Sequence, residues 1–82
     1  MTTQEDVRRW LKEAQERKAK FMIVVVDTFD YEDYPVFCLT EEECNEKYRN
    51  PGQMQRIMEV YDMSLDLEKQ IGEVRSFHPP KS

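Results

Sequence analysis

The chain has 82 residues, with 12 basic and 17 acidic side chains and a formal net charge of −5. Its length allows one domain with a modest core, and its acidity argues against nonspecific binding to the phosphates of DNA or RNA. The longest apolar run, 21–26, is far short of the roughly 20 residues that span a membrane, and the polar N-terminus predicts no signal peptide. Cys38 and Cys44 are too few for a disulfide framework, so we expect two buried, reduced thiols in a cytoplasmic protein.

An amphipathic helix is predicted over residues 3–19. Its apolar side chains recur at i, i+3, i+4 and i+7, which places them on one face of the helix. Two capping boxes are available at its start, Thr2 with Glu5 and, in a weaker version one residue later, Thr3 with Asp6. The apolar stripe consists of Val7, Trp10, Leu11 and Ala14.

A central strand is predicted at 21–26, because Val and Ile crowd this run and both of its faces are apolar. An acidic and aromatic loop, residues 27–34, leads from it to a second strand at 36–39. Pro35 fits the start or the edge of that strand, since proline cannot donate a hydrogen bond to a neighbouring strand.

A second helix is predicted from Thr40, which opens a T-E-E-E capping box, to about Tyr48, just before an Asn-Pro-Gly stop. Residues 53–62 fit either a helix or a half-buried strand, and the turn residues on both sides favour the strand. A short helix follows at 65–71, with Ser64 as its predicted N-cap.

The predicted order α-β-β-α-β-α indicates a small α+β domain over residues 1–76, with an extended tail at 77–82. We expect a three-stranded, mainly antiparallel sheet with its helices on one face. The strand at 21–26 is apolar on both faces, so the second face needs another cover. A second copy of the chain is the simplest one, and we therefore expect a homo-oligomer.

The loop at 27–34 combines carboxylates with aromatic rings, a mixture that a plain connector does not need. Carboxylate oxygens suit Mg²⁺ or Ca²⁺, but their spacing is not that of an EF-hand. A second interpretation is a solvated turn in which Asp side chains accept from nearby backbone N–H groups. A third is recognition of a ligand or protein, for example by stacking on a nucleobase. The loop carries Asp27, Asp30, Glu32 and Asp33 with Phe29, Tyr31 and Tyr34 among them.

The chain offers little for catalysis. It has no recognisable nucleophile elbow, and Gly52 and Gly72 are too few for a P-loop or a dinucleotide-binding loop. His78, the single histidine, fits a general acid or base, a surface residue or a ligand contact. Arg56 and Arg75 could bind a phosphate group. We therefore expect binding without turnover, without a cofactor and without a bound metal.

Three stretches, MIVVVDTFDYEDYPVF, MQRIMEVYDMSLDLEKQI and RSFH, resemble a family of small, mostly uncharacterised proteins of bacteriophages and prophages. The resemblance covers roughly residues 20–78. Tiny acidic phage proteins are similar in kind to inhibitors of bacterial defence, some of which sequester nucleotide immune signals while others block a defence protein. The resemblance implies action in the cytoplasm of the bacterial host.

Three functional hypotheses follow from these residues and this resemblance. The first is an anti-defence protein that sequesters a nucleotide-derived immune signal, such as a cyclic nucleotide or an ADP-ribose derivative. The second is an acidic inhibitor or adaptor that blocks a basic host defence protein, and the third is a metal-dependent hydrolase of the signal. The ligand-binding residues predicted for the first are Asp27, Thr28, Asp30, Tyr31, Tyr34, Arg56, Arg75 and His78.

Overall fold

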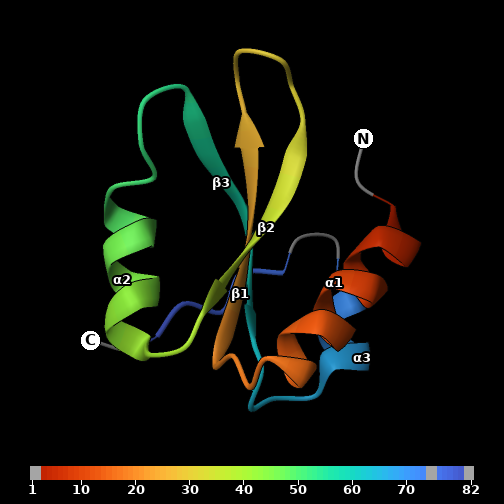
Figure 1. Ribbon diagram of the computed structural model, residues 1–82. Helices are drawn as coiled ribbons and strands as arrows, with labels where there is room; N and C mark the ends of the chain where they lie inside the picture. The colour runs from red at the N-terminus through yellow and green to blue at the C-terminus, as the bar shows by residue number, and fades with distance from the viewer. Residues whose placement is uncertain (1–2, 74–75, 81–82) are drawn as a thin grey trace.

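The computed structural model describes residues 3–73 and 76–80, which form a three-stranded sheet with helices on both sides (Figure 1). The sheet order is β2-β1-β3, and β1 is antiparallel to both neighbours. This confirms the predicted α+β class and the small antiparallel sheet. No helix in this part of the chain is both long and apolar enough to cross a membrane. The elements are α1 (Gln4–Glu16), β1 (Phe21–Asp27), β2 (Asp33–Cys38), α2 (Glu41–Arg49), β3 (Gln55–Asp62) and α3 (Leu67–Ile71).

β1 is central because both of its faces are apolar, and each face contributes to a separate core. Successive side chains of a strand point to opposite faces of the sheet. Met22 and Val24 therefore belong to one buried cluster, whereas Phe21, Ile23 and Val25 belong to another. All five side chains are buried.

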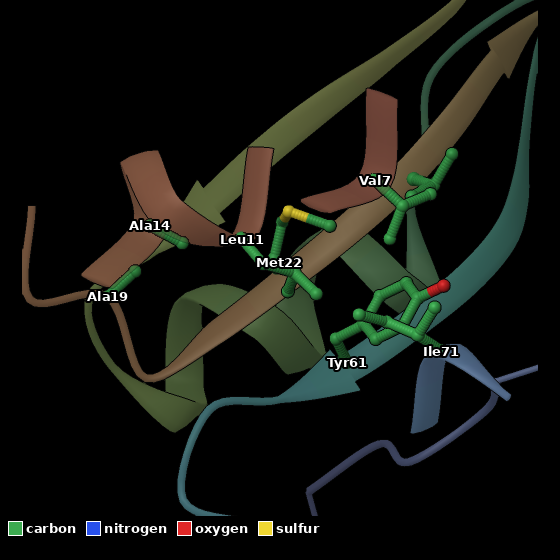
Figure 2. Close-up of a cluster of buried hydrophobic side chains, with 8 residues drawn as sticks. Val7, Leu11, Ala14, Ala19, Met22, Tyr61 and Ile71 are labelled. Carbon is green, nitrogen blue, oxygen red and sulfur yellow. The ribbon is translucent and has the colours of Figure 1, made fainter. Parts of the chain in front are cut away.

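The first core lies between the sheet and the pair of helices α1 and α3 (Figure 2). The stripe predicted for α1 faces the sheet as expected, with Trp10 at the margin of the cluster. This core therefore packs a helix that precedes the sheet in the sequence, α1, beside one that follows it, α3. Its buried residues are Val7, Leu11, Ala14, Ala19, Met22, Val24, Tyr61 and Ile71.

α2 covers the opposite face of the sheet, so the prediction that all helices lie on one face is wrong (Figure 1). Cys44 of α2 is buried in the second core with Cys38 of β2 and Val60 of β3. Cys44 is the one buried residue of this highly charged helix, so its sequence has no apolar stripe that indicates a face. The homo-oligomer stays a prediction, but it loses its original reason because α2 covers the face that was expected to need a second chain.

α1 begins and ends at local signals that differ slightly from the prediction. Its N-cap is Thr3, whose hydroxyl accepts from the N–H of Asp6 while the carboxylate of Asp6 accepts from the N–H of Thr3. The helix ends earlier than predicted because Lys18 adopts a left-handed φ of 58°. The N–H of Ala19 then donates to the carbonyl of Ala14 at 2.9 Å, as in a Schellman ending.

α3 begins later than predicted, because Asp66 and not Ser64 is its N-cap. The carboxylate of Asp66 accepts from the N–H of Lys69 at 3.3 Å. Ser64 instead directs its N–H and its hydroxyl to the carboxylate of Asp62. The serine therefore belongs to the turn that follows β3.

The strand interpretation of residues 53–62 is confirmed by β3, and part of the expected tail lies against its outer edge. The N–H of Val60 donates to the carbonyl of Ser76 at 3.0 Å, and the N–H of His78 donates to the carbonyl of Val60 at 2.9 Å. These bonds form a parallel bridge between Val60 and Phe77. The extended segment 76–78 is thus bonded to the domain.

The second strand starts earlier than predicted, so Tyr34 lies in β2 and not in the loop. Pro35 lies inside this strand, opposite Val24 of β1. β2 is at the edge of the sheet, and proline is tolerated in an edge strand where the missing N–H would point outward. Pro35 therefore leaves the pairing with β1 intact.

Candidate functional site

The β1–β2 loop, residues 28–32, projects from one end of the sheet, at the top of Figure 1. Two large side chains in it, Phe29 and Tyr31, are 76% and 77% exposed. Burying a side chain of this size is worth roughly 1.5–3 kcal/mol. Two aromatic rings left in solvent at one loop tip therefore indicate a contact surface rather than a packing role.

Hydrogen bonds fix the backbone that carries these rings. The N–H of Asp27 donates to the carbonyl of Glu32 at 2.9 Å, and the N–H of Tyr31 donates to the carbonyl of Asp27 at 2.7 Å. Two carboxylates add local turns: Asp27 accepts from the N–H of Phe29 at 2.8 Å, and Asp30 accepts from the N–H of Glu32 at 3.2 Å. The loop therefore presents its aromatic rings from a defined backbone.

The carboxylates of Asp27 and Asp30 thus have the role that the solvated-turn interpretation assigned to them. The metal interpretation needs several ligands at one place. Within residues 3–73 and 76–80, no group of three His, Cys, Asp or Glu side chains is arranged to hold a metal ion.

Tyr31 adopts a left-handed backbone with a φ of 60°. This region costs a residue with a side chain roughly 1–2 kcal/mol, and glycine is the residue that occupies it without a steric penalty. The fold of the loop would thus be served better by glycine than by tyrosine. Strained residues of this kind cluster at binding sites, which supports a role for the Tyr31 ring itself.

A second loop lies beside the first. The α2–β3 loop, residues 50–54, is joined to it by a hydrogen bond of 2.6 Å from the N–H of Thr28 to the carbonyl of Met54. Met54 is 55% exposed and also has a left-handed φ, of 58°. Sequence reasoning missed Met54, because only the pairing of β1 with β3 brings residue 54 next to residue 28.

Tyr34 and Arg56, both predicted site residues, lie on opposite faces of the sheet. Tyr34 pairs with Val25 and packs against the core under α2. Arg56 pairs with Val26, and neighbouring residues of a strand point to opposite faces. A ligand held by Arg56 would therefore not meet the ring of Tyr34 within one chain.

His78 lies farther along β3, away from the loop tip. Its backbone is bonded to Val60, and its Nε2 is 2.7 Å from Oε1 of Glu73. Val60 is about 16 Å from Gln55, the residue that starts β3 beside the loop, at the usual rise of a strand. Arg75, the remaining predicted site residue, lies outside the described residues.

Two pockets in the described part of the chain lie away from the loop tip. One of about 450 Å³ lies between α1 and residues 63–68. Another of about 320 Å³ lies between β2 and α2. Neither of these two pockets is lined by residues 28–32, and the loop projects beyond the end of the sheet (Figure 1).

The two thiols are inert core groups, as the sequence predicts. Cys38 and Cys44 are free and buried in the second core. Contact with Cys38, together with burial, raises the pKa of the Cys44 thiol. The same contact lowers the pKa of the Cys38 thiol, but neither side chain is more than 1% exposed. Thiolate chemistry also needs solvent access, so this pair is unsuited to nucleophilic catalysis.

Comparisons with protein-family models, with curated proteins and with solved structures found no match for this chain. The resemblance to phage proteins therefore stays a prediction. The candidate site rests on the geometry of the two loops.

Proposed function

We propose that this chain is a non-enzymatic binding protein that recognises a partner protein through the tip of the β1–β2 loop. The observation that carries the proposal is the pair of rings of Phe29 and Tyr31, about three quarters exposed on a backbone fixed by hydrogen bonds. This corresponds to the second hypothesis, an acidic inhibitor or adaptor.

Aromatic side chains are well suited to this task. A few buried aromatic or arginine residues provide most of the binding energy of a typical interface. A ring on a fixed backbone loses little conformational freedom when it is buried, so less of that energy is lost to ordering. Phe29 and Tyr31 are aromatic residues that a partner can bury, and their backbone is already fixed by hydrogen bonds.

The charges around the rings define the chemistry of the partner. The loop and its flanks carry four carboxylates within seven positions, and the whole chain has a net charge of −5. A surface with Lys and Arg around an apolar pocket would complement this arrangement and accelerate association at low salt. Because of the resemblance to phage proteins, basic proteins of bacterial defence systems are the first partners to screen. The four carboxylates are Asp27, Asp30, Glu32 and Asp33.

Capture of a nucleotide signal has less support from this arrangement. It needs rings and phosphate-binding cations around one cavity. Tyr34 and Arg56 lie on opposite faces of the sheet, and His78 lies near Glu73. An open tip would have to bind such a ligand without enclosing it.

The test is capture from a bacterial lysate followed by direct titration. The immobilised chain and its Phe29→Ala/Tyr31→Ala variant are compared, and the protein retained by the wild type alone is purified. We expect calorimetry to give at least a 30-fold loss of affinity for the double variant, or about 2 kcal/mol. Leu65→Ala is the matched control, because Leu65 is an exposed apolar residue next to α3. Equal affinity of the double variant and the wild type would refute the proposal.

A second arm tests the other two hypotheses. The chain is incubated with cyclic nucleotides and ADP-ribose, freed of unbound ligand, and heated to release what it holds. Intact ligand in the supernatant would replace the proposal by signal capture. Cleaved ligand, with cleavage lost in a chelator, would replace it by hydrolysis.

A further inference from the structure

The protruding end of the sheet is built from two loops, and this refines the proposed function. We propose that Met54 of the α2–β3 loop is a third anchor of the docking surface, beside Phe29 and Tyr31. The partner would then offer one apolar depression wide enough for side chains from both loops, with basic residues on the side that meets the β1–β2 loop. This inference rests on the proposed function.

The two loops are held together by main-chain bonds. The strand pairing of Val26 with Arg56 and of Asp27 with Gln55 continues to this end of the sheet. Directly beyond it, the N–H of Thr28 donates to the carbonyl of Met54 at 2.6 Å. A partner that contacts the first loop therefore meets Met54 at a fixed position.

Met54 has no packing role that explains its side chain. It is 55% exposed and belongs to neither buried cluster. Its φ of 58° favours glycine or asparagine over a long apolar residue. An unbranched thioether adapts to irregular apolar surfaces and is frequent in binding sites, so its chemistry fits the neighbouring rings.

Charge favours a basic partner over a second copy of the chain. The β1–β2 loop, which carries both rings, is flanked by acidic residues, whereas the α2–β3 loop is flanked by Arg49 and Arg56. Two β1–β2 loops brought together would place carboxylates of equal sign at one interface. Like charges in an interface cost binding energy. A surface rich in Lys or Arg would instead be attracted to the same residues.

The first experiment uses the photo-crosslinking amino acid p-benzoylphenylalanine as the probe. It replaces Phe29, Met54 or, as a control on the exposed side of α1, Glu16, in the full chain expressed in bacteria. We expect positions 29 and 54 to form adducts with the same protein and position 16 to form none. Adducts from 29 but not from 54, or with different proteins, would overturn this inference and leave the proposed function intact.

Two other outcomes of this experiment have distinct meanings. Adducts from neither loop position would overturn the proposed function together with the inference. Adducts between two copies of this chain would show that the surface joins identical chains, which would also overturn the basic partner.

The second experiment measures affinity for the crosslinked protein after its purification. We expect Met54→Ala to bind about tenfold more weakly, whereas Gln53→Ala, a change at the neighbouring exposed residue, binds like the wild type. Gly52→Ala is expected to weaken binding as well, because Gly52 has a φ of 104° and an added β-carbon would meet Oε1 of Gln55 at 3.1 Å. Wild-type affinity of Met54→Ala would refute the third anchor.

Salt dependence tests the basic rim separately. Raising the ionic strength from about 0.05 M to about 0.5 M shortens the range of electrostatic attraction severalfold. We expect affinity to fall over this range. An affinity that does not change with salt would refute the basic rim.

Discussion

The N–H of Thr28 lies 2.6 Å from the carbonyl oxygen of Met54, and this hydrogen bond joins the β1–β2 loop to the α2–β3 loop. Each loop also contains a non-glycine residue in the left-handed region, Tyr31 in the first and Met54 in the second. Such conformations persist where the surrounding structure dictates them. The effects of substitutions in the two loops are therefore expected to be non-additive, as is common for residues in contact.

Tyr31→Gly should separate stability from binding. Glycine removes the steric penalty of a side chain at a φ of 60°. This gain exceeds the extra conformational entropy that glycine loses on folding, so we expect about 0.5–1 kcal/mol of net stabilisation. The exposed ring contributes little to the fold. We expect thermal unfolding to show a higher Tm than the wild type, and titration with the partner to show weaker binding. A lower Tm would mean that the ring supports the fold.

Lys18→Gly should stabilise the protein by a similar amount, about 0.5–1 kcal/mol, because Lys18 closes α1 with a φ of 58°. For a domain of this size the Tm should rise by roughly 4 °C. Lys12→Gly is the control, since a glycine inside α1 should instead cost about 1 kcal/mol. Equal effects of the two changes in urea unfolding would contradict the left-handed ending of the helix.

Gln70→Leu should destabilise the fold although the two side chains are similar in size. Gln70 is 2% exposed, and its amide bonds both the N–H and the carbonyl of Asp62 at 2.9 Å. Leucine leaves these partly buried backbone groups without that partner, which costs about 2–3 kcal/mol. Gln15→Leu, at an exposed position of α1, should change the unfolding free energy by less than about 0.5 kcal/mol. The midpoint of urea unfolding reports both variants.

Alkaline pH should weaken the fold through Tyr61. Burial raises the pKa of this tyrosine from an ordinary value of 10.0 to about 12. The unfolded chain therefore loses the phenolic proton first, so the contribution to stability is complete below pH 10 and is lost as the pH rises toward 12.

Tyr61→Phe provides the comparison for this pH dependence. The variant cannot donate to the carboxylate of Glu59, as Tyr61 does at 3.1 Å, so it should be less stable at neutral pH. Its Tm should fall less steeply than that of the wild type between pH 10 and 12. Parallel Tm curves for the two proteins would show that this phenol does not control the alkaline transition.

The central part of the fold could be predicted from local sequence patterns. The doubly apolar run at 21–26 identifies a middle strand, and Thr40 marks the start of α2 because its hydroxyl accepts from the N–H of Glu43. The face that α2 covers could not be predicted, since a single buried residue, Cys44, gives no periodicity.

The candidate site could be predicted only in part, for a similar reason. The composition of the loop directed attention to Tyr31 and its neighbours. The position of Met54 depends on a pairing between distant strands, and the separation of Tyr34 from Arg56 depends on the alternation of faces in that pairing. Neither relationship can be predicted from the sequence near these residues.

Pro35 has a consequence for how the protein behaves at high concentration. An open sheet edge invites another chain to add a strand, which leads to aggregation. Here β2, an edge strand, carries a proline, and the outer edge of β3 is bonded at Val60 by residues 76–78. Each edge therefore has one position at which a strand of another chain cannot pair, which lowers the tendency of the sheets of two copies to join edge to edge.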